Sequence, residues 1–382
     1  MVKLGITDVT KSGEVKAHAR DLLDGVCMEH ESATTATPAM LKWCIEKGID
    51  ERYFGFVAKR EKVQFLCEGL GGCRIGEVCG GGETHGILAN NLAFLEDASS
   101  QDGLTRTVVE LKIEHSKTKF SRYMNMAATT GTSGIKTGAV FMDYCKAAGF
   151  TMTSTLQAGV RVVRPDVWVV RVSLLGLNEA RLNCLLIDLE RGSREFPGLA
   201  HHLDSTRIDA KRRHFASGAM SQEKKYVNVM SGDSKDERLD RLIQYLESRG
   251  WQAAKVPGPL LLSTTGGRQQ KPKLMPLSAS TASAPTKELL TKAWQAGFIR
   301  GVNHDADLDL PPDVPPRWST HSLRRLADTV ARRYREAMNV TVDQIDIYFG
   351  WHEKILLKAM QVYYSSLSLR ERMLQARITG MM

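Results

Sequence analysis

A histidine and an arginine three positions apart begin the most informative segment of this 382-residue chain. His321 and Arg324 lie at the start of an apolar stripe with helical spacing, formed by Leu323, Leu326, Ala327 and Val330. The stripe predicts a helix over 321–336, in which positions three apart share one face. The positive N-terminus of a helix, a guanidinium group and an imidazole together favour binding of a phosphate.

Other residues suited to reactions at a phosphate lie far away in the sequence. Arg74 and Glu77 are three positions apart in GGCRIGEV, Lys117 lies in EHSKTKF, and Tyr363 and Tyr364 are adjacent in MQVYYSS. Guanidinium groups neutralise the charge that develops on a phosphate, a lysine can protonate a leaving oxygen, and a phenol can attack phosphorus. These residue types together can break a phosphodiester bond.

The elements expected to position these residues are helices and a small sheet. We predict a helix from Thr37, a second helix over 61–70, and a short helix start at Arg74 that ends in a Gly-rich turn. Between 92 and 126, the runs NNLAFLED, TVVELKIEHS and SRYMNMA predict three antiparallel strands with a basic hairpin tip. Lys117 would lie at that tip.

The following region is less informative. It contains a Val-rich run over 160–175, an apolar run near Leu185, and an amphipathic helix with Leu239, Leu242 and Leu246 on one face. Exposed loops are expected at 230–237 and 266–284, a helix at 286–298, a proline-rich approach at 305–317 and a last helix at 353–366.

Composition narrows the partners. Lys and Arg total 52 against 43 Asp and Glu, and the resulting charge of +9 and pI of about 9.1 favour a polyanion such as nucleic acid. The seven cysteines form no C-x-x-C pair, and the spacing of His201, His202, Asp204 and His214 matches no usual metal site. We therefore expect reduced thiols and no metal. Neither a secretion signal nor a long apolar run is present, so we expect an intracellular protein without a membrane span.

Taken in order, these motifs resemble the catalytic pattern of tyrosine recombinases, the phage-integrase family. That pattern has an Arg in a Gly-Arg-x-x-Glu-like box, a Lys on a following β-hairpin, a His-x-x-Arg helix start, a Gly-His or Gly-Trp, and a Tyr near the end. The corresponding residues of this chain are Arg74 with Glu77, Lys117, His321 with Arg324, Trp351 in FGWHEK, and a tyrosine of MQVYYSS. The resemblance covers roughly 35–126 and 256–370, and the stretch between has no counterpart.

The resemblance implies an α+β fold: a mainly helical catalytic domain with a small three-stranded antiparallel sheet and a large insertion. It divides the chain into an N-terminal extension (1–35), a first part of the catalytic domain (36–130), an insertion of unknown role (131–255) and a second part of the catalytic domain (256–382). Family members usually carry a further N-terminal domain that closes around DNA, and the resemblance begins only after about 35 residues here.

The resemblance also implies a mechanism. Arg74 and Arg324 would bracket the nonbridging oxygens of one phosphate, the tyrosine would attack phosphorus, Lys117 would protonate the 5′-oxygen, and His321 would assist proton movement. The 3′-phosphotyrosyl ester conserves the energy of the broken bond, so neither a metal nor a nucleotide cofactor is needed.

Several positions stay open. Tyr363 continues the apolar face of its predicted helix, which favours Tyr364 as the nucleophile, but the interval from Trp351 to either tyrosine is a few residues longer than the family's. His352 is an alternative to Trp351. Lys119 is an alternative to Lys117 on the hairpin. Further cations expected to contact DNA are Arg122, Arg325, Arg332 and Arg333.

The predicted function is thus site-specific recombination or integration of a mobile element on double-stranded DNA, by a homo-oligomer that forms a tetramer on paired sites. Such a protein would act in the nucleus of a eukaryote and otherwise in the cytoplasm. Two alternatives remain. A type IB topoisomerase uses a similar residue set as a monomer to relax DNA, and an inactive relic would only bind DNA.

Overall fold

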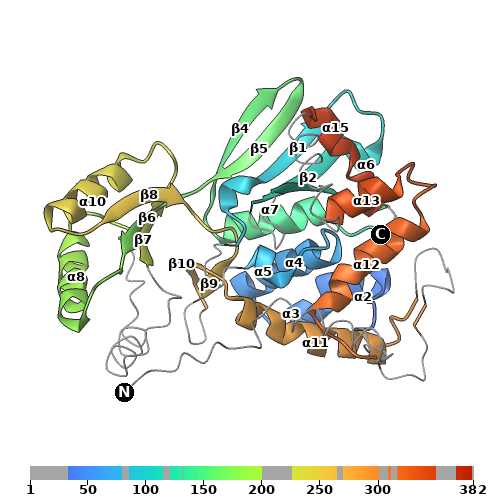
Figure 1. Cartoon of the computed structure of the whole chain (residues 1–382), viewed down its shortest axis with the longest axis horizontal. Helices are drawn as coiled ribbons and strands as arrows, with labels where there is room; N and C mark the ends of the chain where they lie inside the picture. Colours follow the sequence, from blue (N-terminus) through green and yellow to red (C-terminus); the bar gives the residue numbers. More distant parts are fainter. Residues whose placement is uncertain are drawn as a thin grey trace, which may run out of the picture.

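The computed structural model describes residues 33–79, 86–114, 121–131, 133–199, 226–264, 270–300, 309–310, 316–349 and 367–380. Helices pack against several small antiparallel sheets, which is an α+β arrangement (Figure 1). The described residues form a main body and, beside it, a smaller lobe of three strands and two helices (Figure 1). In the described part of the chain, no helix has the length and apolar character needed to cross a membrane.

Helices from the first and last thirds of the chain form most of the main body. The first segment comprises α2 (Pro38–Trp43), the π-helix η2 (Cys44–Gly48), α3 (Ile49–Arg52) and α4 (Gly55–Gly69). The Thr37 hydroxyl accepts a hydrogen bond from the Met40 N–H at 3.2 Å, so the predicted helix start is an N-cap. Later helices are α7 (Thr137–Ala147), α11 (Ala279–Gln295), α12 (Thr320–Arg333) and α13 (Val342–Phe349).

Helix α4 lies at the centre of these helices and is buried on almost every side. Phe65 and Leu66 are fully buried in a core that also contains Leu290 of α11 and Leu323 of α12. The helix begins at Gly55 (φ +57°), six residues before the predicted start, because Phe56, Val57 and Ala58 are also buried and extend its apolar surface.

The main sheet has five antiparallel strands in the order β3-β2-β1-β5-β4. They are β1 (Leu92–Asp97), β2 (Thr107–Ile113), β3 (Arg122–Ala127), β4 (Thr151–Gln157) and β5 (Val160–Asp166). The three predicted strands are present, but the expected size of three strands is wrong. The first half of the Val-rich run is β5, which pairs with β1 at Leu95↔Val162 and adds a β4–β5 hairpin to the sheet.

Side chains alternate between the two faces of this sheet. Leu92, Val109 and Met124 face the core that contains α4 and α7. Leu95 and Val108 face a second core with Met373 and Ala376 near the C-terminus. That second layer comprises α6 (Gly103–Arg106), α15 (Leu369–Leu374) and α16 (Arg377–Gly380), and the 3₁₀-helix η3 (Ala89–Asn91) precedes β1.

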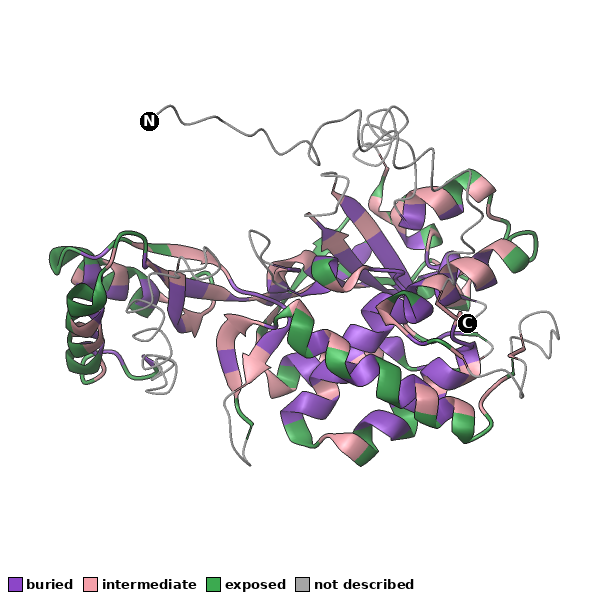
Figure 2. Ribbon diagram, turned by 60° about the horizontal axis from the view of Figure 1, so that its bottom comes forward, coloured by how far each residue is buried: buried purple, intermediate pink, exposed green. Residues whose placement is uncertain are grey.

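The smaller lobe is formed by β6 (Trp168–Ser173), α8 (Glu179–Gly192), β7 (Tyr226–Gly232), α10 (Glu237–Ser248) and β8 (Ala253–Pro257). Its strands are ordered β7-β6-β8, and α8 and α10 contribute Leu185, Leu242 and Leu246 to a core of its own. The outer faces of its helices are exposed (Figure 2). The lobe begins later than residue 131, because α7 and β5 pack in the main body.

Two expected loops contain regular structure. Residues 230–232 of the expected 230–237 loop complete β7, and Asp236 caps α10 by accepting the Arg238 N–H at 3.0 Å. In the expected 266–284 loop, β10 (Pro272–Pro276) pairs with β9 (Leu262–Thr264). Helix α11 begins at Ala279 rather than 286, because Ser278 accepts the Thr281 N–H at 3.3 Å. The predicted helix 353–366 lies outside the described residues.

Candidate phosphate-binding site

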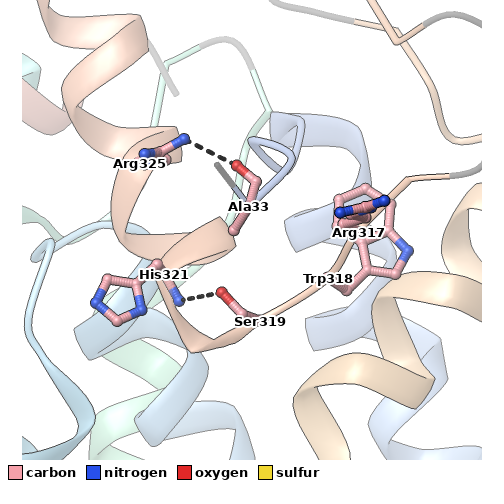
Figure 3. Close-up of a pocket in the computed structure, with 6 residues that line it drawn as sticks. All are labelled: Ala33, Arg317, Trp318, Ser319, His321 and Arg325. Carbon is pink, nitrogen blue, oxygen red and sulfur yellow. Dashed lines mark hydrogen bonds between the residues drawn. The ribbon is translucent and has the colours of Figure 1, made fainter. Parts of the chain in front are cut away.

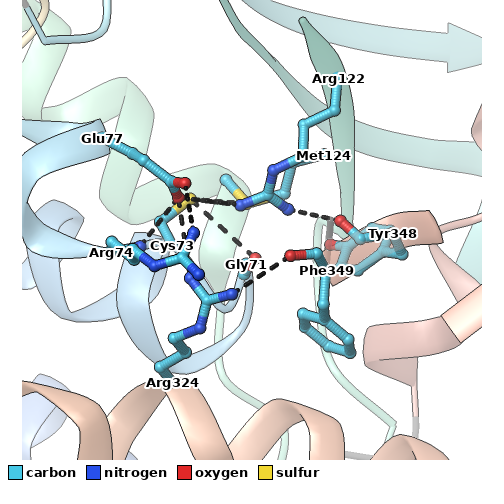
Figure 4. A network of polar contacts seen from close by, with 9 residues as sticks. All are labelled: Gly71, Cys73, Arg74, Glu77, Arg122, Met124, Arg324, Tyr348 and Phe349. Carbon is cyan, nitrogen blue, oxygen red and sulfur yellow. Dashed lines mark hydrogen bonds and ion pairs between the residues drawn. The ribbon is translucent and has the colours of Figure 1, made fainter. Parts of the chain in front are cut away.

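A buried carboxylate, Glu77, organises the candidate site (Figure 4). It belongs to the short helix α5 (Ile75–Val78), whose N-cap residue is Arg74. Glu77 Oε2 accepts the backbone N–H of Arg74 at 2.9 Å, and Glu77 Oε1 accepts from Arg74 Nη1 at 3.2 Å. The spacing of three that the sequence shows is therefore a local cap that holds both side chains at the helix start.

The turn before this helix depends on glycine. Gly72 has a φ of +58°, a region that side-chain-bearing residues rarely adopt, and a Cβ there would lie 2.3 Å from Cδ1 of Phe349. A Cβ on Gly71 would lie 1.7 Å from Sδ of Met124 in β3. The two glycines thus let the start of α5 approach both β3 and α13.

Two more arginines reach Glu77 from distant parts of the sequence. Arg122, the first residue of β3, donates from Nη2 to Glu77 Oε2 at 3.1 Å and from Nη1 to the carbonyl oxygen of Tyr348. Arg324 of α12 lies with Nη1 3.9 Å from Glu77 Oε2, and its Nη2 donates to the carbonyl oxygen of Phe349 at 3.3 Å. Three elements, α5, β3 and α12, therefore meet at one carboxylate, and the end of α13 holds two of the arginines (Figure 4).

Charge at this cluster is strongly positive, because three guanidinium groups surround one carboxylate. Burial alone would raise the pKa of Glu77, but Arg122, the Arg74 N–H and Arg324 lower it below its usual range. Burial and the nearby Arg74 lower the pKa of Arg324 to about 10, so Arg324 stays protonated at neutral pH. The arginines are therefore cationic, and the carboxylate neutralises only part of their charge.

The arginines differ in exposure. Arg122 and Arg324 are each 5% exposed, whereas the side chain of Arg74 is 36% exposed. His321, one turn before Arg324 on α12, is exposed as well. An anion that approaches from solvent would therefore meet Arg74 and His321 first, in front of the buried charge of Arg324.

His321 lies within the field of these cations. Partial burial, Arg324, Arg74 and Arg325 all lower its pKa below the usual value. The neutral imidazole is then the dominant form at neutral pH, and it can accept a proton or a hydrogen bond. An anion bound nearby would partly offset this effect.

The sequence-predicted residues divide into two groups. Arg74, Glu77, His321 and Arg324 come together at the cluster described above. Six others lie outside the described residues: Lys117, Lys119, Trp351, His352, Tyr363 and Tyr364. For these, the sequence prediction stands as a prediction.

The arginines expected to contact DNA differ in exposure and in partners. Arg122 is buried and holds Glu77, so it is a positioning residue and not a surface cation. Arg332 pairs with Asp328 at 2.8 Å and with Asp346, so two carboxylates neutralise it. Arg325 donates to the carbonyl oxygen of Ala33 at 2.9 Å, and the end of α12 leaves Arg333 exposed.

Sequence reasoning missed the groups that complete the cluster. The carbonyl oxygens of Tyr348 and Phe349 fix two guanidinium groups, and Cys73 places its Sγ 3.7 Å from Nη2 of Arg122. Backbone carbonyls leave no signal in a sequence. Among the described residues, no group of His, Cys, Asp and Glu side chains is arranged to hold a metal ion.

Comparison with protein-family models, with curated protein sequences and with solved structures finds no match to this chain.

Proposed function

We propose that this chain cleaves and rejoins DNA strands through a 3′-phosphotyrosyl intermediate, in the manner of a tyrosine recombinase. The observation that carries the proposal is that Arg74 and Arg324, far apart in sequence, contact opposite oxygens of the same buried carboxylate. Two guanidinium groups held this way can contact one phosphate together, which is what the mechanism requires.

The described residues suit three parts of the reaction. Arg74 is open to solvent and can bind a nonbridging phosphate oxygen, while Arg324 stabilises the added negative charge of the transition state from behind. Neutral His321 can accept a proton. Glu77 holds the arginines and neutralises part of their mutual repulsion without contacting the phosphate.

In the proposed step, the phenol oxygen of Tyr364 forms a bond to phosphorus and the bond from phosphorus to the 5′-oxygen breaks. The phenol proton passes to His321, and Lys117 protonates the departing 5′-oxygen. Rejoining is the reverse reaction, in which a 5′-hydroxyl attacks the phosphotyrosyl ester. For recombination, four copies would act on two paired DNA sites.

The test uses a pool of duplexes of random sequence, each with a single nick at a fixed position. A strand cleaved beside the nick releases a short fragment, which diffuses away, so rejoining fails. The wild type is expected to form a denaturant-resistant protein–DNA adduct, whose DNA is then sequenced. Tyr364→Phe should form none and Tyr363→Phe should retain it. The opposite result would move the nucleophile to Tyr363. Absence of any wild-type adduct would refute the cleavage proposal.

A matched pair of arginine variants separates chemistry from general charge. Arg324→Lys keeps a positive charge but loses the planar guanidinium, and should reduce the rate of adduct formation by about 10²-fold or more. Arg241→Lys, an exposed position on α10 in the smaller lobe, should leave that rate unchanged. Relaxation of a supercoiled plasmid by the isolated monomer would favour the topoisomerase alternative.

A further inference from the structure

A pocket lies at the start of α12, the helix that also carries Arg324 (Figure 3). Its volume is about 350 Å³, and it is lined by Ala33, Arg317, Trp318, Ser319, His321 and Arg325. His321 and Arg325 project from the first turns of α12, and Arg317 and Trp318 belong to the segment that leads into this helix (Figure 3). The pocket is therefore open to the same surface that His321 occupies.

The wall of this pocket is basic. Arg317, His321 and Arg325 follow one another at intervals of four, and none of the lining residues is acidic. Arg317 and His321 are exposed, and Arg325 is half-buried. A concave surface with two guanidinium groups and an imidazole favours an anionic ligand over a neutral or cationic one.

Hydrogen bonds hold the pocket in shape. Arg325 Nη1 donates to the Ala33 carbonyl at 2.9 Å, and the Ser319 hydroxyl accepts the His321 N–H at 3.1 Å (Figure 3). The backbone of Thr34 and that of Arg317 are joined by a hydrogen bond of 2.9 Å from the Thr34 N–H. The Arg325 side chain and the backbone of His321 and Arg317 are thus positioned before a ligand arrives, which reduces the entropic cost of binding.

His321 is common to the pocket and to the Arg74–Arg324 cluster. Arg324 and Arg325 follow His321 by three and four positions on α12, and Arg324, Arg74 and Arg325 all lower its pKa. One imidazole therefore lies near cations of both the cluster and the pocket. Successive phosphates of a nucleic-acid strand are joined by a single sugar, so adjacent cationic positions match the repeat of such a strand.

We propose that this pocket binds a second phosphodiester of the DNA strand, next to the one held by Arg74 and Arg324. The proposal rests on the function proposed above, because it assigns a role to a neighbouring part of the same strand. Arg317 and Arg325 bind one phosphate between them, and His321 lies between the two phosphates. Arg317 and Arg325 set the position of the strand and take no part in bond breaking.

The test measures the affinity of the full chain for a 30-base-pair duplex at several salt concentrations. The slope of log affinity against log salt is negative, and each phosphate contact adds about 0.9 to its magnitude. Arg317→Gln and Arg325→Gln should each reduce this magnitude by about 1. The double variant should also reduce it by about 1, because both side chains bind one phosphate. Arg325→Lys should keep the wild-type slope, and so should the control Arg241→Gln in the smaller lobe.

A loss of about 2 in the double variant would mean two separate phosphates and would overturn the shared pocket. An unchanged slope in all pocket variants, with wild-type unfolding temperatures, would overturn the pocket proposal even if adducts form. Reduced slopes in a protein that never forms an adduct would support the pocket and refute cleavage. A last control adds a mononucleotide at a concentration that does not displace the duplex. If the wild type and Arg317→Gln then have the same slope, the pocket binds free nucleotide and the proposal is wrong.

Discussion

Replacement of Glu77 by Gln should be among the most destabilising single changes in the main body. Glu77 and Arg122 both have side chains about 5% exposed and lie 3.1 Å apart. Loss of one partner from a buried ion pair typically costs about 3–5 kcal/mol, because the other charge is left in a medium that solvates it poorly. The contact with Arg74, which is 36% exposed, adds at most about 1 kcal/mol. We expect a loss of about 4 kcal/mol in the free energy of unfolding.

The assay is urea unfolding at pH 7, followed by circular dichroism and by tryptophan fluorescence. The matched control is Glu336→Gln, which removes a carboxylate 3.9 Å from Arg335 with 90% of its side chain exposed, and should change stability by less than about 0.5 kcal/mol. Arg122→Met in the Glu77→Gln background should restore part of the loss, because it removes the unpaired charge.

The same carboxylate should also control acid stability. The pKa of Glu77 is lowered in the folded state, so its contribution is present above the unfolded pKa and is lost as the pH falls through the folded pKa. Glu77→Gln should therefore flatten the acid limb of the stability curve. A cost below about 1 kcal/mol at pH 7, or a double variant less stable than Glu77→Gln alone, would refute the account of this cluster.

Three further changes test other parts of the fold. Burial raises the pKa of Glu68 to about 8, so the folded chain keeps a proton that the unfolded chain releases. Stability should fall by about 1.4 kcal/mol per pH unit between the unfolded pKa and pH 8, and Glu68→Gln should remove this fall; a flat wild-type profile would contradict it. Gly72→Ala should cost about 2–4 kcal/mol in thermal unfolding, because Gly72 has a φ of +58° and a Cβ there would meet Phe349. Gly76→Ala should be neutral or stabilising, because a Cβ there meets nothing within 4 Å. Equal effects of the two changes would exclude the strain argument. Tyr144→Phe removes a hydroxyl that donates to the Leu260 carbonyl at 2.7 Å and accepts the Leu262 N–H at 3.0 Å. Urea unfolding should show a loss of about 1–3 kcal/mol in the free energy of unfolding. A loss under about 0.5 kcal/mol would argue against both hydrogen bonds.

The sequence predicted the local geometry of two pairs in the cluster. Arg74 with Glu77 and His321 with Arg324 are each separated by three positions, and helical geometry fixes such pairs with little help from the rest of the fold. The strand that begins at Arg122 was also predicted, because short runs of strand-forming residues bounded by turns indicate a sheet.

What could not be predicted depends on contacts between distant segments. The number of strands in the main sheet depends on the pairing of β5 with β1, which the Val-rich run alone does not specify. Burial of Arg122 depends on Glu77 and on the carbonyl oxygen of Tyr348, which lies far along the chain. The ion pair of Arg332 with Asp346 joins two different helices, so the sequence alone does not indicate it.

The way in which the smaller lobe joins the main body has a consequence for folding. The chain leaves the main body after β5 and returns after β8, and these two crossing points touch: the Gly258 N–H donates to the Val167 carbonyl at 2.9 Å. A Cβ on Gly258 would lie 2.8 Å from Cγ1 of Val167, so glycine permits this approach. Since the lobe also has a core of its own, it forms a closed loop of chain that can open and refold as a cooperative unit while the main-body backbone keeps its path. Hydrogen exchange should then report two separate opening free energies within one polypeptide.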